Sequence, residues 1–113
     1  MMQKTGINTT LYNSEADFQS DAIKLIKQLG GYVIKVHVSS YESQGEPDLI
    51  VCYYGKYVAF ELKIKGNKTS NLQAFKLKQI QRAGGIAKAV YTLKEIEDTL
   101  YEIFRIQSGG EPK

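Results

Sequence analysis

The stretch that decides the fold is GEPDLIVCYYGKYVAFELKIKG, residues 45–66. Two runs rich in Val, Ile, Tyr and Phe flank a turn at Gly55, the pattern of a β-hairpin. Three charged residues interrupt strands that are otherwise apolar: Asp48 in the first run, and Glu61 and Lys63 in the second. Because side chains alternate along a strand, Glu61 and Lys63 should project together from the face opposite the core.

The composition predicts a single globular domain over residues 1–113, with a core over about 14–105 and frayed ends. Apolar residues make up 42% of the chain and charged residues 24%, close to the globular average, which excludes wholesale disorder. The one cysteine, Cys52, excludes an internal disulfide and is expected as a small core residue of a cytoplasmic protein. No apolar run approaches the ~20 residues of a membrane helix.

Positive charge is concentrated in one part of the chain. The net charge is only +3, but residues 62–94 hold eight basic residues and no acid. The eight are Lys63, Lys65, Lys68, Lys76, Lys78, Arg82, Lys88 and Lys94. Such a block is either a solvated face or the binding surface for an anionic partner, of which nucleic acid is the first candidate.

Capping residues and periodicity predict the order αβββαβα. Three helices are expected: one capped by Ser14 and ending at Gly30-Gly31, one capped by Ser70 with Gln73 and ending at Gly84-Gly85, and one capped by Thr92 with Glu95. The expected strands are a strand over 32–38, the two hairpin strands, and a strand over 86–91. A polar loop over 39–46 should precede the hairpin.

A carboxylate from the first helix is expected to join the hairpin charges. Glu15 lies three residues before Phe18, so it should extend the buried stripe of that helix toward Asp48 and Glu61. Carboxylates gathered in this way repel one another unless they are neutralised. Lys63 can offset one charge, and Mg²⁺ or Mn²⁺ suits the remaining oxygen ligands better than zinc. Such an ion can activate water against a phosphodiester, with Lys63 holding that water or neutralising charge on the phosphate.

These residues resemble a known family of enzymes. Pro47-Asp48, twelve intervening residues and Glu61-Leu62-Lys63 are similar to the motif of the PD-(D/E)XK nuclease superfamily. The finer pattern resembles its small VRR-NUC and Holliday-junction-resolvase-like members across residues 14–100. It comprises the helical Glu15, GEPDLIV, AFELKIKG, Ser70 with Gln73, and RAGGIAKAVY.

The resemblance implies a fold, an activity and a set of roles. The fold is a restriction-endonuclease-like α/β domain, an αβββαβ core with a mixed central sheet flanked by helices, here followed by a C-terminal helix. The activity is metal-dependent cleavage of DNA, selective for branched, flapped or junction structures. Asp48 and Glu61 would bind Mg²⁺ or Mn²⁺ with the carbonyl of Leu62, Glu15 would assist through the metal or its waters, and Lys63 would be the catalytic lysine.

The sequence alone leaves several interpretations open. Gln73 matches a glutamine of these nucleases but is equally the third residue of a capping box. Lys65, Lys68, Lys76 and Lys78 are reasonable phosphate contacts as a group. Rival functions are a nucleic-acid-binding module that does not cut and a basic interaction protein without a nucleic-acid role.

Assembly is a further expectation. Cutting two strands in concert requires two clusters, which a homodimer provides, and resolvase-like relatives imply one. The last helix offers a surface if its apolar face exceeds what the monomer can cover; otherwise that helix simply closes the monomer's own sheet. The residues of that face are Leu93, Ile96, Leu100 and Phe104.

Overall fold

The computed structural model of the chain describes residues 9–37 and 44–107. The elements are α1 (Glu15–Gln28), β1 (Tyr32–Lys35), β2 (Leu49–Tyr53), β3 (Lys56–Leu62), α2 (Asn71–Arg82), β4 (Ile86–Val90) and α3 (Leu93–Arg105). The predicted order αβββαβα is confirmed. The expected caps are present as well, with Ser14 opening α1 and complete capping boxes opening α2 and α3.

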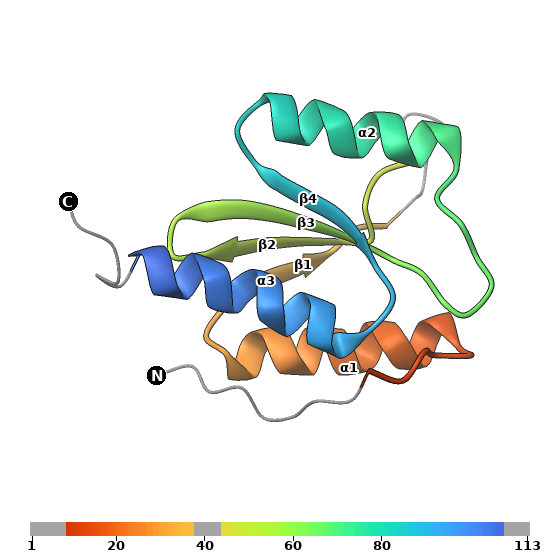
Figure 1. The fold of residues 1–113 in the computed structure, drawn as a ribbon, viewed down its shortest axis with the longest axis horizontal. Coiled ribbons are helices and arrows are strands. Elements are labelled where there is room, and N and C mark those ends of the chain that lie inside the picture. The colour runs from red at the N-terminus through yellow and green to blue at the C-terminus, as the bar shows by residue number, and fades with distance from the viewer. Residues whose placement is uncertain (1–8, 38–43, 108–113) are drawn as a thin grey trace.

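The four strands form one mixed sheet in the order β1-β2-β3-β4. β1, β2 and β3 pair antiparallel, whereas β3 and β4 pair parallel. Parallel neighbours require a crossover connection, and α2 supplies it on one face of the sheet. α1 and α3 lie together on the other face (Figure 1).

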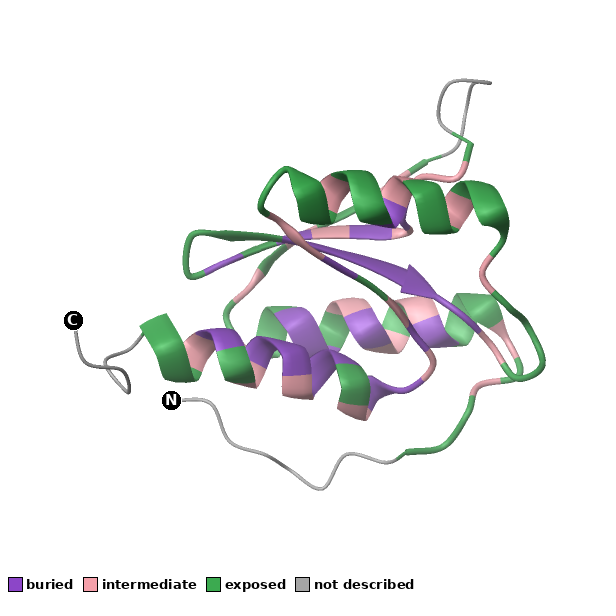
Figure 2. Ribbon diagram, turned by 45° about the horizontal axis from the view of Figure 1, so that its top comes forward, coloured by how far each residue is buried: buried purple, intermediate pink, exposed green. Residues whose placement is uncertain are grey.

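The main core lies between the sheet and the pair α1 and α3 (Figure 2). Alternate residues of β2 and β3 point into it and are fully buried, as the hairpin pattern predicts. α2 covers a smaller cluster on the opposite face, where Leu77 packs on Ala59 and Ala87. These two alanines are small, which allows the helix to pack on β3 and β4.

The last helix, α3, packs within the core of its own chain. Leu93, Ile96, Leu100 and Ile103 are all buried in the main core. Phe104 is partly buried against the same core, so the apolar face of α3 closes the sheet of its own chain, which is the second of the two alternatives that the sequence left open.

Two expectations need correction. The strand predicted over 32–38 ends at Lys35, because its partner strand β2 starts only at Leu49; one further bond, from the Val36 N–H to the Asp48 carbonyl, follows the strand. Val38 lies outside the described residues, as does most of the predicted loop. Cys52 is exposed rather than buried, since it points to the α2 side of the sheet while Tyr53 takes the core position.

Within the described parts of the chain, no helix has the length and apolar character needed to cross a bilayer.

Candidate active site

The charged residues of the hairpin lie at one end of the sheet. Asp48 directly precedes β2. Glu61 is the next-to-last residue of β3, and Lys63 directly follows that strand. Glu61 and Lys63 share a face with Ala59, so both project toward α2, as the alternation predicts. They are buried despite their charge, with Glu61 3% and Lys63 8% exposed. Buried ions of this kind require partners.

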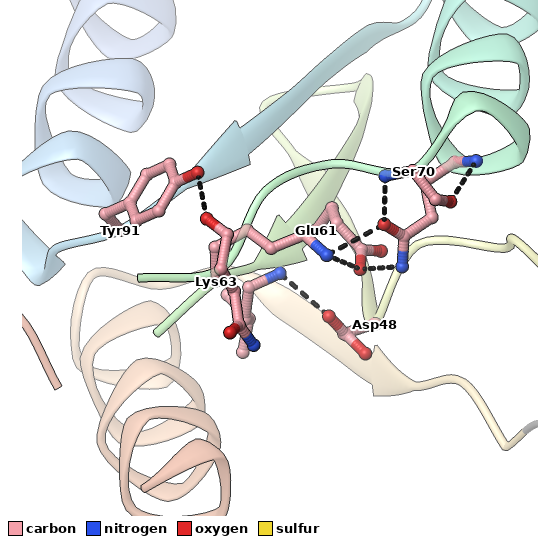
Figure 3. A network of polar contacts seen from close by, with 8 residues as sticks. Asp48, Glu61, Lys63, Ser70 and Tyr91 are labelled. Carbon is pink, nitrogen blue, oxygen red and sulfur yellow. Dashed lines mark hydrogen bonds and ion pairs between the residues drawn. The ribbon is translucent and has the colours of Figure 1, made fainter. Parts of the chain in front are cut away.

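Gln73 of α2 provides those partners by bridging the two charged groups (Figure 3). Its side-chain nitrogen donates to Glu61 Oε2 over 2.6 Å, and its Oε1 accepts from Lys63 Nζ over 2.7 Å. Lys63 Nζ also lies 3.5 Å from Glu61 Oε2, within ion-pair distance. The three side chains form one closed network.

The same glutamine caps its helix. Its backbone N–H donates to Ser70 Oγ over 3.1 Å, and its Oε1 accepts from the Ser70 backbone N–H over 3.0 Å. The cap and the contact with the cluster, which the sequence offered as alternatives, are thus combined in one side chain. The cap fixes the Gln73 side chain, so the first turn of α2 positions the amide that holds Glu61 and Lys63.

Asp48 is tied to the strand that carries the other two groups. The backbone N–H of Leu62 donates to Asp48 Oδ2 over 2.7 Å (Figure 3). The next N–H, of Lys63, points the opposite way and donates to Val90 on β4 over 2.9 Å. In a strand the N–H and C=O of one residue share a side. The Leu62 carbonyl therefore faces the Asp48 side of β3.

The surroundings of Asp48 and Glu61 disfavour the ionised form of both carboxyl groups. Burial raises the pKa of Glu61 to about 7, and the charge of Asp48 adds to this while Lys63 opposes it. Burial also raises the pKa of Asp48, against the hydrogen bond from Leu62. Glu61 Oε1 is buried and has no hydrogen-bond partner among the described residues. The site thus holds acceptor capacity that the protein leaves unused.

Glu15 takes a different position from the one expected. It is exposed in the first turn of α1, so the prediction that it extends the buried stripe is wrong. The stripe starts at Phe18, one turn later. The negative charge of Glu15 nevertheless raises the pKa values of Asp48 and Glu61. Over residues 9–37 and 44–107, no three His, Cys, Asp or Glu side chains gather closely enough to hold a metal ion.

The remaining donors suit a hard divalent cation. Asp48, Glu61 with its free Oε1, and the Leu62 carbonyl offer only oxygen. Mg²⁺ typically takes one or two carboxylates from a protein and keeps several of its waters. Two central carboxylates, with Glu15 outside them, fit this requirement.

The predicted phosphate contacts divide into two groups. Lys65, Lys68 and Lys78 are exposed. Lys76 is only partly exposed and pairs with Glu46 over 3.1 Å, which neutralises its charge. Its partner Glu46 lies in the segment before Pro47, so Lys76 links α2 to the start of β2. Of the four predicted contacts, Lys65, Lys68 and Lys78 are therefore the exposed ones, and Lys65 and Lys68 lie in the loop that follows Lys63.

Two tyrosines that the sequence reasoning did not select hold the loop after β3. The Tyr91 hydroxyl donates to the Asn67 carbonyl over 2.7 Å (Figure 3). The Lys65 N–H donates to the Tyr12 carbonyl over 2.9 Å. The loop that carries Lys65 and Lys68 is thus attached on both sides. No sequence signal indicates these contacts, because they join positions more than twenty residues apart.

Neither a scan against protein-family models nor a search of curated proteins finds a match. Among solved structures, one described as "VRR_NUC domain" matches with a TM-score of 0.62 and 30% sequence identity, covering 78% of this chain and 94% of that one. The four-stranded mixed sheet flanked by helices is accordingly the restriction-endonuclease-like nuclease fold. With this identity over nearly the whole of that domain, the chain belongs to the VRR-NUC nuclease family.

Proposed function

We propose that this chain is a metal-dependent nuclease that hydrolyses phosphodiester bonds in DNA, selectively in branched, flapped or junction structures. The observation that carries the proposal is the state of Glu61. It is 3% exposed, it lies beside Asp48, and one of its oxygens has no protein partner among the described residues. A purely structural ion pair would leave this acceptor unpaired at a cost, whereas a cation ligand requires it.

The residues of the site would have different roles in the reaction. Asp48, Glu61 and the Leu62 carbonyl would hold Mg²⁺ or Mn²⁺, with Glu15 acting on the ion or its waters from outside. When bound, such an ion lowers the pKa of a coordinated water and offsets charge on the phosphate. Lys63 would hold the attacking water or neutralise the growing charge of the phosphate oxygens.

The basic residues would bind the rest of the substrate. Lys65 and Lys68 extend from the loop that directly follows Lys63, and Lys78 is exposed on α2. Phosphate contacts of this kind position DNA without reading its sequence. Selectivity would then come from DNA shape, which supports a preference for branched structures.

A cleavage assay with labelled linear, flapped and four-way DNA tests the proposal. Cleavage should require Mg²⁺ or Mn²⁺, and Lys63→Met should lower its rate at least about 100-fold, as loss of a group that stabilises transition-state charge does. Lys94→Met is the matched control, because Lys94 pairs with Asp98 on the surface of α3. Salt-dependent binding without cleavage would indicate the non-cutting module instead, and absence of both would indicate an interaction protein.

A further inference from the structure

The segment that leads into Asp48, residues 44–47, lies outside the backbone ladder of the sheet, and we call it the lead-in segment. The register of β2 and β3, if continued, would pair Pro47 with Leu62. Pro47 has no N–H to donate across this pair. The Leu62 N–H instead donates to the Asp48 side chain over 2.7 Å. The ladder between β2 and β3 therefore ends before Asp48, and a side-chain bond takes the place of its last backbone pair.

The lead-in segment rests against helix α2 (Figure 1). Gly45 has a φ of +82° and lies so close to this helix that a Cβ on it would meet the Leu72 side chain at 2.5 Å. Lys76 Nζ donates to Glu46 Oε2 over 3.1 Å, within ion-pair distance. No backbone hydrogen bond joins the lead-in segment to another described residue. Among the described residues, its polar attachment to the domain is therefore the Lys76 ammonium.

The same part of α2 holds the other half of the site. Gln73 and Lys76 are three residues apart, so they lie on one side of the helix, one turn from each other. Gln73 bridges Glu61 and Lys63, whereas Lys76 holds Glu46. One helical turn consequently joins the strand that carries the second carboxylate to the segment that leads into the first.

Asp48 depends on such an attachment more than Glu61 does. When both carboxylates are ionised they repel each other. Glu61 lies within β3, where the backbone pairs with strands on both sides, but Asp48 lies before β2, so movement of the lead-in segment would displace it. The side chains of Lys76 and Glu46 are 24% and 36% exposed. A pair this accessible to solvent contributes little to global stability, so its loss should act locally.

We propose that Lys76 is a positioning residue of the site, which holds the lead-in segment on α2 through Glu46. Asp48 directly follows that segment, so its carboxylate is thereby kept on the Leu62 N–H. The charge of Lys76 is used within the protein in this role, which removes Lys76 from the predicted phosphate contacts. The consequence for metal binding rests on the proposed function, whereas the hold on Asp48 is a property of the metal-free chain.

The Leu62 amide reports on this hold, because its acceptor is the Asp48 carboxylate. Amide hydrogen exchange of the full chain, followed by NMR without metal or DNA, therefore tests the proposal. Lys76→Met keeps an unbranched side chain but removes the charge, and it should speed exchange of the Leu62 amide about tenfold. The Lys63 amide donates to Val90 over 2.9 Å and is the internal reference, so its exchange should change less than about twofold.

Variants of the partner and of an unrelated ion pair complete the test. Glu46→Gln removes the other charge of the pair and should speed exchange of the Leu62 amide as much as Lys76→Met does. The double variant should be no worse than either single variant, since two residues that act through one contact are not additive. Lys94→Met is the matched control: it removes the ion pair with Asp98, 2.8 Å long on α3, and should leave the Leu62 amide unchanged.

The affinity for manganese measures the consequence for the site. In calorimetric titration without DNA, Lys76→Met and Glu46→Gln should each bind Mn²⁺ about tenfold more weakly than the wild type, as expected for the loss of a contact that supports a metal ligand. Lys94→Met should keep the wild-type affinity. A wild type that binds no Mn²⁺ contradicts the proposed function, and exchange of the Leu62 amide still decides the role of Lys76.

Four results would overturn the role of Lys76. Unchanged exchange of the Leu62 amide in a folded Lys76→Met variant is the first. Equal acceleration of the Leu62 and Lys63 amides is the second, because it indicates a loss of global stability. Weaker DNA binding with unchanged exchange would make Lys76 a phosphate contact. Weaker Mn²⁺ binding in Glu46→Gln but not in Lys76→Met would make Glu46 a ligand of the ion.

Discussion

The side-chain amide of Gln73 donates to Glu61 across 2.6 Å, so the first turn of α2 supports a carboxylate of β3. The same side chain accepts from Lys63 and from the backbone of Ser70. Helix capping and the arrangement of the site are consequently coupled, and substitutions at Gln73 can separate them.

Two substitutions of Gln73 should differ in stability but not in activity. Glu at this position still completes a capping box, whereas Ala does not. Gln73→Ala should therefore lower the free energy of unfolding by about 1 kcal/mol, the typical contribution of a hydrogen bond, whereas Gln73→Glu keeps the cap but adds a carboxylate beside Glu61, so its loss of stability should grow with pH. Both remove the donor to Glu61 and should reduce cleavage more than tenfold. Thermal unfolding and initial cleavage rates measure the two effects. Wild-type cleavage by Gln73→Glu would limit this residue to the cap.

Metal-free stability should fall as the pH rises. The pKa of Glu61 is raised to about 7 from 4.5, so its stabilising contribution is complete below pH 4.5 and is lost as the pH rises through 7. The loss for this group is at most about 3 kcal/mol. Urea unfolding in EDTA between pH 5 and 8 measures it. Glu61→Gln cannot ionise and should show a smaller decline, and an equal decline in both proteins would contradict the assignment.

Metal binding should be visible without cleavage. Mg²⁺ or Mn²⁺ offsets the repulsion between Asp48 and Glu61, so either ion should raise the melting temperature of the wild type. Asp48→Asn should reduce this increase and also abolish most cleavage. EDTA should stop cleavage, while Ca²⁺ should permit DNA binding without turnover, since its looser coordination positions water poorly. Full activity in EDTA would refute the metal mechanism.

Tyr91 should affect proteolysis and DNA binding through the loop that it holds. Tyr91→Phe removes the hydrogen bond to Asn67 and should speed tryptic cleavage after Lys65 and Lys68 several-fold. DNA affinity should fall modestly, because those lysines are then less well positioned. Tyr54→Phe is the control, since Tyr54 is 51% exposed at the hairpin turn, away from this loop. Equal proteolysis of the two variants would show that Tyr91 does not stabilise the loop.

The sequence alone determined the elements and their order. Helix starts depend on local capping, and the boxes opening at Ser70 and Thr92 form within four residues. Strand alternation is equally local, so it placed Glu61 and Lys63 on one face of β3. These features could be predicted because each depends on backbone geometry over a short stretch.

Only the tertiary structure decided what those faces meet. Among the described residues, α2 covers β3 and β4 and reaches Ile50 of β2 but not Cys52, which is exposed although Val51 and Tyr53 beside it are buried. The same packing brings Gln73 between Glu61 and Lys63 and pairs Lys76 with Glu46, while Glu15 stays at the surface. These outcomes depend on where one element rests on another. Side-chain periodicity specifies which residues share a face, but the distances between elements are set by the packing of the whole domain.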